Sequence, residues 1–336
     1  MKPQNSSRAK APRSRSFDVQ EENTLMPFLL QVLHDQSRTA VKSFLAHKLV
    51  QVNNRITTRF DSPLKPGDTV SVGMNKSAAP FHHPMLNLLY EDEHLLVVEK
   101  ASGLLSMGTE RDKTKTAYYI LNNYLKNKDP RNHIFILHRL DKETSGILLF
   151  AKNQTAAARL QNQRAEGLSE KTYLAAVSGF MPVDEYGSFH RISIPLAPDP
   201  DNRLKMVVST DGTLPGSKHA ETLYSVLKST GPDAAAPASL VMLRLKTGRT
   251  HQIRVHMASL GHPLLGDSLY CLSDMSNHFS RAALHAWKLK FQLPFPIDEI
   301  ASDTPSSMYH DKNAKKEISL EAPLPEDFKK FYETIF

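Results

Sequence analysis

The spacing of apolar residues divides residues 25–73 into two helical segments followed by strands and turns. The helical segments are 25–33 (LMPFLLQVL) and 37–49 (SRTAVKSFLAHKL), and the strand segments are 50–60 (VQVNNRITTRF) and 64–73 (LKPGDTVSVG). Ser37 stands where a side-chain cap for the second helix is expected, and Asn53-Asn54 predicts a turn between two strands. We therefore expect a small α+β domain over residues 23–74.

The rest of the chain shows short apolar strands interspersed with helical spacing. Strands are predicted within residues 87–103, 134–138, 147–152, 171–179 and 239–247, and helices over residues 116–127, 154–167 and 250–261. Gly167 and Gly261 stand at the ends of the last two helices, where glycine is common, and Thr250 is expected to cap the third. Residues 85–336 therefore form one predicted domain of mixed α and β structure.

Polar segments precede or interrupt these patterns. Residues 1–22 contain Lys, Arg, Ser and Pro with no acidic residue before Asp18, which predicts a disordered basic tail. Such a tail either touches phosphates or is only solvated, and both interpretations fit. Residues 75–84 have no periodicity and predict a linker, and residues 302–315 predict a polar surface insertion.

Composition narrows the class of protein. The 336 residues carry 42 Lys+Arg against 35 Asp+Glu, a formal charge of +7, which fits a nucleic-acid partner but also fits plain solubility. Apolar runs are far shorter than the roughly 18 residues that a membrane helix needs, so we expect no membrane partner. The single Cys271 excludes an intramolecular disulfide and a Cys-rich metal site. With no apolar secretory signal, we expect a cytoplasmic protein. We also expect it to be a monomer.

The run HRLDKETSGILLFAKN at residues 138–153 places a carboxylate in a turn between two apolar strands. Asp141 lies there beside Arg139 and Lys142, and these cations favour its ionised form although buried strands flank the turn. An ionised carboxylate in this position can act as a nucleophile or a base. An Asp in a turn can also do no more than cap its own backbone, and the local pattern leaves both roles open.

A second run, LKTGRTHQIRVHMASLGHPLLGDSLY at residues 245–270, carries two arginines on or beside a predicted helix. Arg249 and Arg254 suit contact with a phosphate or a carboxylate. His251 and His256 are five positions apart, not the four that place two zinc ligands on one helix face, so we expect no metal site. The Gly and Lys spacing of a phosphate-binding loop is missing, and no hydrolase or dinucleotide fingerprint occurs.

Basic side chains on the second helix suggest an RNA contact, although a solvated helix face has the same pattern. The candidate residues are Arg38, Lys42 and Lys48, which can share one face, and Arg55 at the following turn. Ser37-Arg38, Val41-Lys42, Val52-Asn53 and Leu64…Gly67-Asp68…Val70 resemble the small RNA-binding domain first known from ribosomal protein S-four. In that family the helix pair and the following turn present basic side chains to structured RNA.

Four spaced segments resemble the RluA family of pseudouridine synthases, whose hallmark is a His-Arg-Leu-Asp run followed by a Thr-Ser-Gly turn. They occur in the family's order at residues 90–107, 138–153, 171–179 and 247–270, with weaker matches at 218–222 and 281–291. One departure is Lys100-Ala101, where the family usually has Lys-Pro, and it touches no catalytic role. The resemblance implies the pseudouridine synthase fold, an α+β domain with a largely antiparallel mixed sheet and a central catalytic cleft.

The resemblance also implies an isomerase that acts on uridine in RNA. The bond from ribose to N1 breaks, the uracil turns, and C5 joins the sugar. Because nothing is oxidised or released, no cofactor or metal is implied. Asp141 matches the family's essential aspartate, Tyr173 the aromatic residue that stacks on the uracil, and Arg254 the basic residue that pairs with the aspartate.

Three further residues are expected to bind the substrate. Arg139 resembles the family arginine that helps to extrude the uridine. His138 precedes it in the same motif, and Arg249 is the cation of the second motif that suits a phosphate. The domain arrangement favours large-subunit ribosomal RNA, whereas a transfer RNA substrate would keep the same chemistry. A non-catalytic assembly factor would be expected to have lost Asp141, Tyr173 or Arg254. The sequence therefore predicts an RNA pseudouridine synthase whose partner is structured RNA.

Overall fold

The structure is a computed structural model that describes residues 14–34, 36–46, 49–73, 81–108, 112–271, 279–294 and 317–336. The chain divides into two compact units, Met1–Phe81 and His82–Phe336. None of the described helices combines the length and apolar character needed to cross a membrane.

Short strands and two helices form the smaller unit. In chain order they are β1 (Ser14–Asp18), β2 (Asn23–Thr24), α1 (Leu25–Val32), α2 (Arg38–Ala46), β3 (Val50–Val52), β4 (Arg55–Ile56), β5 (Pro63–Leu64) and β6 (Thr69–Gly73). The main sheet has the order β1-β6-β3-β4. Leu29 of α1, Val41 of α2 and Val70 of β6 are fully buried in one apolar cluster, so the helices pack on the sheet through their apolar faces.

Two local predictions for this unit are confirmed. The Ser37 hydroxyl oxygen accepts a hydrogen bond from the Ala40 backbone N–H at 3.2 Å, as a helix cap does. Asn53 and Asn54 both have left-handed backbones, with φ of 50° and 61°. Asn tolerates this conformation better than most residues, so the pair closes the tight turn between β3 and β4.

The prediction of a disordered tail over residues 1–22 is wrong from Ser14 onward. Residues Ser14–Asp18 form β1, which pairs antiparallel with β6, and Phe17 lies opposite Val70. Phe17 packs against the unit's core and Val19 is buried, so two apolar residues anchor a segment whose composition is otherwise basic and polar. The predicted tail up to residue 13, residues 75–80 of the predicted linker and the predicted insertion at 302–315 lie outside the described residues.

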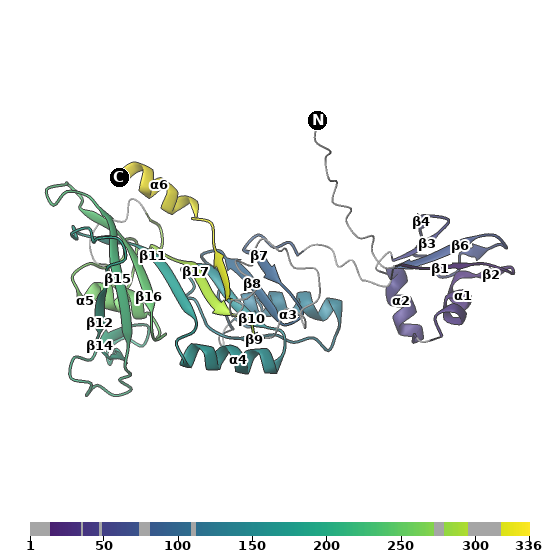
Figure 1. Cartoon of the computed structure of the whole chain (residues 1–336), viewed down its shortest axis with the longest axis horizontal. Coiled ribbons are helices and arrows are strands. Elements are labelled where there is room, and N and C mark those ends of the chain that lie inside the picture. The colour runs from purple at the N-terminus through teal and green to yellow at the C-terminus, as the bar shows by residue number, and fades with distance from the viewer. Residues whose placement is uncertain are drawn as a thin grey trace. The chain divides into compact units, whose positions relative to one another are not determined.

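A ten-stranded sheet forms the larger unit (Figure 1). Its elements are β7 (Leu86–Glu91), β8 (Leu95–Lys100), α3 (Ala117–Lys128), β9 (Phe135–Ile136), β10 (Ser145–Ala151), α4 (Gln154–Ala165), β11 (Glu170–Ser178), β12 (His190–Ser193), β13 (Leu196–Pro198), β14 (Met206–Val208), β15 (Glu221–Ser229), β16 (Ala238–Leu245), α5 (Gln252–Ser259), β17 (Leu284–Gln292), β18 (Glu317–Glu321) and α6 (Glu326–Ile335). The strand order is β12-β15-β16-β11-β17-β10-β8-β7, with β18 on β17 and β9 on β10. Strands β10 and β17 run parallel, whereas the pairs that flank them are antiparallel, which confirms the predicted mixed sheet.

Two apolar clusters hold this sheet at either end of the unit. Leu160 of α4 packs with Val97 of β8 and Leu149 of β10, and all seven positions of β10 are buried. At the other end, Phe328 and Phe331 of α6 pack in a cluster with residues of β11 and β16. Strand β10 is therefore a fixed element, and the turn that precedes it is held at one end by the core.

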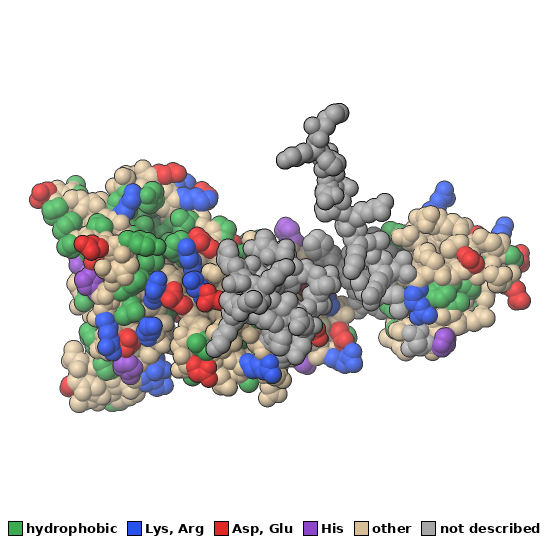
Figure 2. Space-filling model, viewed as in Figure 1, with side chains coloured by type: hydrophobic (Ala, Val, Ile, Leu, Met, Phe, Trp, Pro, Cys, Tyr) green, Lys and Arg blue, Asp and Glu red, His purple; other side chains and the backbone are tan. Residues whose placement is uncertain are grey.

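Charged side chains are mixed over the surface of the larger unit. On the face shown in Figure 2, lysine and arginine side chains are interspersed with acidic ones. The formal charge of +7 is therefore not gathered into one basic area on the described part of that face. Any cation that contacts a substrate is therefore identified by its own position in the fold.

Candidate active site

Two adjoining cavities lie beside the turn that precedes β10. The larger encloses about 330 Å³, within the range of about 300–1,000 Å³ that ligand sites occupy, and the smaller about 60 Å³. Both are lined by Arg139, Asp141, Tyr173, Leu245 and Arg249, the larger also by His138 and Lys171, and the smaller also by Thr144, His251 and Arg254. All six residues that the sequence assigned to catalysis or substrate binding therefore line this pair of cavities.

Three separate elements bring the catalytic candidates together. Asp141 lies in the turn between β9 and β10, Tyr173 lies on β11, and Arg254 lies in the first turn of α5. The Tyr173 side chain is 5% exposed and sits where the pairing of β11 with β17 shifts register, opposite Ala286. Because β10, β17 and β11 are neighbours in the middle of the sheet, residues far apart in the sequence meet beside these central strands.

The predicted substrate-binding residues occupy different positions around the cavities. Arg139 is exposed at the larger cavity. The ring nitrogen Nε2 of His138 accepts a hydrogen bond from the Leu149 backbone N–H at 3.2 Å, which fixes the imidazole against β10. Arg249 is exposed, and its Nε donates to the His219 carbonyl at 2.8 Å.

The predicted RNA-binding residues belong to the smaller unit. Arg38 and Lys42 are exposed on α2, and Arg55 is exposed on β4. Arg38 and Lys42 are four positions apart on the helix, which places them on one face. Lys48 lies outside the described residues. The described part of this unit thus presents three of the four predicted cations to solvent.

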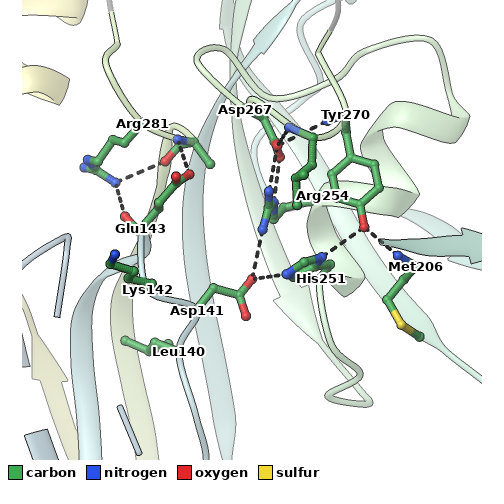
Figure 3. Close-up of polar contacts among 12 residues, drawn as sticks. Leu140, Asp141, Lys142, Glu143, Met206, His251, Arg254, Asp267, Tyr270 and Arg281 are labelled. Carbon is green, nitrogen blue, oxygen red and sulfur yellow. Dashed lines mark hydrogen bonds and ion pairs between the residues drawn. The ribbon is translucent and has the colours of Figure 1, made fainter. Parts of the chain in front are cut away.

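Arg254 is held mainly by a carboxylate other than the one predicted. It makes a bidentate pair with Asp267, from Nε at 2.6 Å and from Nη2 at 2.7 Å, whereas Nη1 lies 3.6 Å from Asp141 Oδ2. Figure 3 shows the guanidinium between the two carboxylates. Asp141 is therefore a secondary partner, and Asp267 fixes the plane of the guanidinium so that one edge faces Asp141.

The electrostatics of this pair keep Arg254 charged. Its side chain is 6% exposed and that of Asp267 is fully buried. Burial lowers the pKa of Arg254, but the hydrogen bonds and the charge of Asp267 outweigh burial and raise the pKa above its ordinary value. Asp141 is 30% exposed at the cavity, so a fixed cation lies behind a carboxylate that a substrate can reach.

Backbone contacts clamp the turn on both sides of Asp141. The Ser106 hydroxyl both donates to the Leu140 carbonyl at 2.6 Å and accepts from the Leu140 N–H at 2.9 Å. On the other side, the Lys142 carbonyl accepts from the Gly103 N–H at 2.8 Å and from Lys100 Nζ at 3.2 Å. The loop after β8 therefore fixes the backbone of the residue before and the residue after Asp141.

The Thr-Ser-Gly turn after Asp141 permits a close approach of two strands. Gly146 has φ of 111°, and a Cβ at this position would lie 2.2 Å from the Ala286 carbonyl oxygen. Only glycine lets β10 lie this close to β17. Arg281, which is paired with Asp327 of α6, donates to the Glu143 carbonyl at 3.1 Å. This buried contact ties the turn to the C-terminal helix.

Lys100 is a buried lysine directly behind the catalytic turn. It is fully buried at the end of β8, and its Nζ donates to the carbonyls of Ala101 at 3.0 Å, Leu104 at 2.8 Å and Lys142 at 3.2 Å. Burial and the charge of Arg281 lower the pKa of Lys100 to about 7, and the charge of Asp141 opposes this fall. Ala101 contributes its carbonyl to Lys100 and donates its N–H to the Met85 carbonyl at 2.9 Å, a bond that proline could not make.

We expect Lys100→Met to remove a pH dependence of stability. In the unfolded chain Lys100 has its ordinary pKa of 10.5, against about 7 when folded. Between those values the unfolded state holds the extra proton, so this residue makes the free energy of unfolding rise with pH by about 1.4 kcal/mol per unit. Urea unfolding can be followed through Trp287, the single tryptophan, which lies on β17.

The free energy of unfolding is measured for both chains at pH 7.5, 8.5 and 9.5. The value for the native chain minus the value for Lys100→Met should rise by about 1.4 kcal/mol per pH unit. Lys115→Met, at an exposed lysine, is the matched control for loss of a lysine. A difference between the native chain and Lys100→Met that stays constant over this range would contradict the lowered pKa of Lys100 in this buried site.

The helix predicted over residues 250–261 begins later than expected. It spans Gln252–Ser259, and the residue at its N-terminal cap is His251 with φ of 55°, not Thr250. The Gln252 side-chain oxygen accepts from the Arg249 N–H at 2.9 Å and from the Thr247 hydroxyl at 2.8 Å. These bonds stabilise a tight turn before the helix, so Thr250 has no capping position to fill.

Sequence reasoning missed four residues of this site: Lys100, His251, Asp267 and Tyr270. His251 was weighed only as a metal ligand, and the other three lie inside the quoted motifs without a local pattern that marks them. Among the described residues, no group of three or more His, Cys, Asp or Glu side chains is arranged to hold a metal ion.

Comparisons with known proteins identify relatives of this chain. The family model described as RNA pseudouridylate synthase matches residues 94–259. An uncharacterized RNA pseudouridine synthase of Bacillus subtilis, YhcT, is 32% identical over 303 residues, which is 89% of each chain. The ribosomal large subunit pseudouridine synthase D of Nitrosomonas europaea is 31% identical over 277 residues, 79% of this chain and 76% of that one. The dual-specificity RNA pseudouridine synthase RluA of Vibrio parahaemolyticus is 35% identical over 212 residues, 63% and 79% respectively.

A solved structure shares the fold. Human RNA pseudouridylate synthase domain containing 4 matches with a TM-score of 0.53 and 23% sequence identity, over 74% of this chain and 92% of that one. The similarity covers about the length of the larger unit. It supports the ten-stranded sheet as the fold that carries the cavities.

Proposed function

The chain belongs to the RluA family of RNA pseudouridine synthases, and from this premise we propose that it isomerises uridines in large-subunit ribosomal RNA. An RNA pseudouridine synthase breaks the bond from ribose to N1, turns the uracil and joins C5 to the same ribose carbon. The observation that carries the proposal is the placement of Asp141, Tyr173 and Arg254 on adjoining cavities beside the central strands of the sheet.

Asp141 is the group that acts on the nucleotide. The Arg254 guanidinium lies 3.6 Å from one of its oxygens and compensates its negative charge, while the clamped backbone on both sides fixes where the carboxylate points. From this position it can attack the ribose, attack the base, or remove a proton from the sugar. All three routes start from the same carboxylate, so each of them needs the positive charge of Arg254 beside Asp141.

Tyr173 and the cations at the cavity hold the target nucleotide. An extruded uridine leaves its stack at a cost of a few kcal/mol, which contacts in the pocket must offset. Tyr173, buried on β11 and lining both cavities, offers an aromatic face for the uracil. Arg139 and Arg249 are exposed beside it and suit contact with the RNA phosphates.

Two features support ribosomal RNA as the substrate. Three relatives that carry the name ribosomal large subunit pseudouridine synthase D are 31–32% identical, and the chain covers 75–76% of their length. The smaller unit has motifs that resemble a ribosomal RNA-binding domain, and it exposes Arg38, Lys42 and Arg55. We propose that this unit binds structured RNA away from the target uridine.

Mapping of pseudouridines tests the substrate class directly. Carbodiimide modification followed by primer extension should show at least one large-subunit ribosomal RNA stop in the parent strain that disappears when the gene is deleted. The same map of transfer RNA should be unchanged. Loss of stops in transfer RNA alone would move the activity to that substrate, and loss in both would assign a dual specificity.

We expect neutralising the three exposed cations of the smaller unit to weaken RNA binding more at low salt than at high salt. In Arg38→Gln/Lys42→Gln/Arg55→Gln, each lost phosphate contact should reduce the slope of log K against log salt by about 0.7–0.9. Arg59→Gln is the control, because Arg59 in the same unit is already paired with Asp61 at 3.2 Å. Filter-binding titrations across a salt series measure both slopes.

The rate of isomerisation on saturating RNA should change little in the triple variant, because none of the three residues lines the cavities. An unchanged salt slope would show that these cations make no contact with RNA phosphates.

A further inference from the structure

His251 lies beside Asp141 and has no part in the mechanism above. Its Nε2 is 3.9 Å from Asp141 Oδ2, the same oxygen that Arg254 Nη1 approaches to 3.6 Å. In Figure 3 the other carboxylate oxygen points away from both groups. Two groups on Oδ2 restrict rotation of the carboxylate and leave Oδ1 as the oxygen that can react.

The backbone at His251 is held in an uncommon conformation that directs this side chain. A φ of 55° is strained for a residue other than glycine, and such residues are concentrated at functional sites. The Gln252 side chain maintains the turn through its bonds to Thr247 and Arg249, and its Nε2 donates to the Glu221 carbonyl at 2.9 Å. The imidazole is therefore positioned by the fold and not by a flexible loop.

Tyr270 selects the tautomer of the imidazole. The Tyr270 hydroxyl oxygen accepts from the Met206 N–H at 2.8 Å and lies 2.9 Å from His251 Nδ1. Since the oxygen already accepts one bond, its own proton can be donated to Nδ1, and the ring proton then resides on Nε2. Burial lowers the pKa of His251 although the charge of Asp141 raises it, which keeps the ring neutral and its single N–H directed at Asp141.

We propose that His251, held as the Nε2–H tautomer by Tyr270, is a positioning residue that donates a hydrogen bond to Asp141 Oδ2 during the reaction. The inference rests on the proposed role of Asp141 and deepens it. A shift of about 1 Å converts the observed separation into a hydrogen bond, and contacts of this kind commonly tighten when substrate binds. Asp267 links the two residues that flank His251 and Asp141. Its Oδ1 accepts from Arg254 and also from the Tyr270 N–H at 3.3 Å.

His251→Asn is the informative variant, because Asn tolerates the left-handed backbone but its amide is too short to reach Asp141. We expect kcat for pseudouridine formation to fall about 10–100-fold with KM for RNA unchanged, since misplacement of a reacting group by about 1 Å has this effect. His251→Gln restores an N–H near the Nε2 position and should recover most of the rate. His190→Asn, at an exposed histidine of the larger unit, is the control.

Tyr270→Phe tests the tautomer of His251 separately. It also tests the inferred hydrogen bond to Asp141 if His251→Asn does not fold. The variant keeps the ring that lies 5.1 Å from the Arg254 guanidinium carbon. It removes the hydroxyl, and with it both the proton offered to His251 and the oxygen that accepts from the Met206 N–H. We expect a smaller loss of kcat than in His251→Asn, again at constant KM.

A folded His251→Asn with the native kcat, or one that Gln does not rescue, would overturn the inference. So would a Tyr270→Phe variant with the native kcat. In each of these cases the native chain still forms pseudouridine, so the proposed function stands. If the native chain itself forms none in ribosomal or transfer RNA, the proposed function fails and the inference falls with it.

Discussion

Asp141→Asn is expected to lower the single-turnover rate of pseudouridine formation by about 10⁴-fold or more, as loss of a reacting group does. The amide has nearly the shape of the carboxylate but can neither attack carbon nor accept a proton. Arg254 remains paired with Asp267, so the fold and the affinity for RNA should be retained. Nuclease digestion followed by nucleoside chromatography measures the pseudouridine formed with enzyme in excess.

Glu143→Gln is the matched control for this loss of charge. Glu143 lies two residues further along the same turn, and its Oε2 accepts from the Ala282 N–H at 3.1 Å, a bond that the Gln amide oxygen can also accept. The control should keep a rate close to that of the native chain. Substantial activity in Asp141→Asn would show that Asp141 does not act on the substrate. An equal loss in both variants would show that the negative charge of the turn matters and that Asp141 has no special part in it.

Arg254→Gln is expected to damage both stability and rate. Removing the guanidinium leaves Asp267 fully buried without its cation, and breaking a buried pair from one side costs about 3–5 kcal/mol of unfolding free energy. The rate should fall by about 10²–10³-fold, because Asp141 loses the fixed cation that compensates its charge. Urea unfolding followed by Trp287 fluorescence gives the first quantity, and single-turnover assays give the second.

A double variant separates these two effects of Arg254. Arg254→Gln/Asp267→Asn replaces the ion pair with two amides, so no uncompensated charge is buried and most of the lost stability should return. The rate should stay low, because no cation faces Asp141. Recovery of the rate together with stability would mean that Arg254 has only a structural role and does not support the charge of Asp141.

The architecture was predictable where a local pattern decides the structure. Helical spacing over residues 154–167 and the strand at 171–179 gave α4 and β11, because apolar periodicity and a terminal glycine are local properties. The smaller unit's helix pair was predicted for the same reason. Strand β1 was missed because its stability comes from pairing with β6 and from the burial of Val19, which are both non-local.

The site was predictable as a set of motifs but not as a set of contacts. Asp141, Tyr173 and Arg254 were named from the family resemblance, and the sheet order brings them together. The predicted pair of Arg254 with Asp141 is present, at 3.6 Å. The closer partner Asp267 was not predicted, because nothing local distinguishes it from other acidic residues. His251 and Tyr270 were missed because their pairing depends on a left-handed turn and on Met206 of β14, a strand distant in sequence.

Tritium release reports on isomerisation by Asp141 without intermediate steps, because formation of the bond from C5 to the ribose expels the hydrogen on C5. RNA carrying uridine tritiated at C5, prepared from a strain that lacks the gene, is incubated with the full-length chain and with Asp141→Asn. We expect the native chain to release tritium to solvent, at a level matching the missing pseudouridines, and the variant to release none above background. Equal release by both chains, or no release by the native chain, would contradict isomerisation of uridine by Asp141.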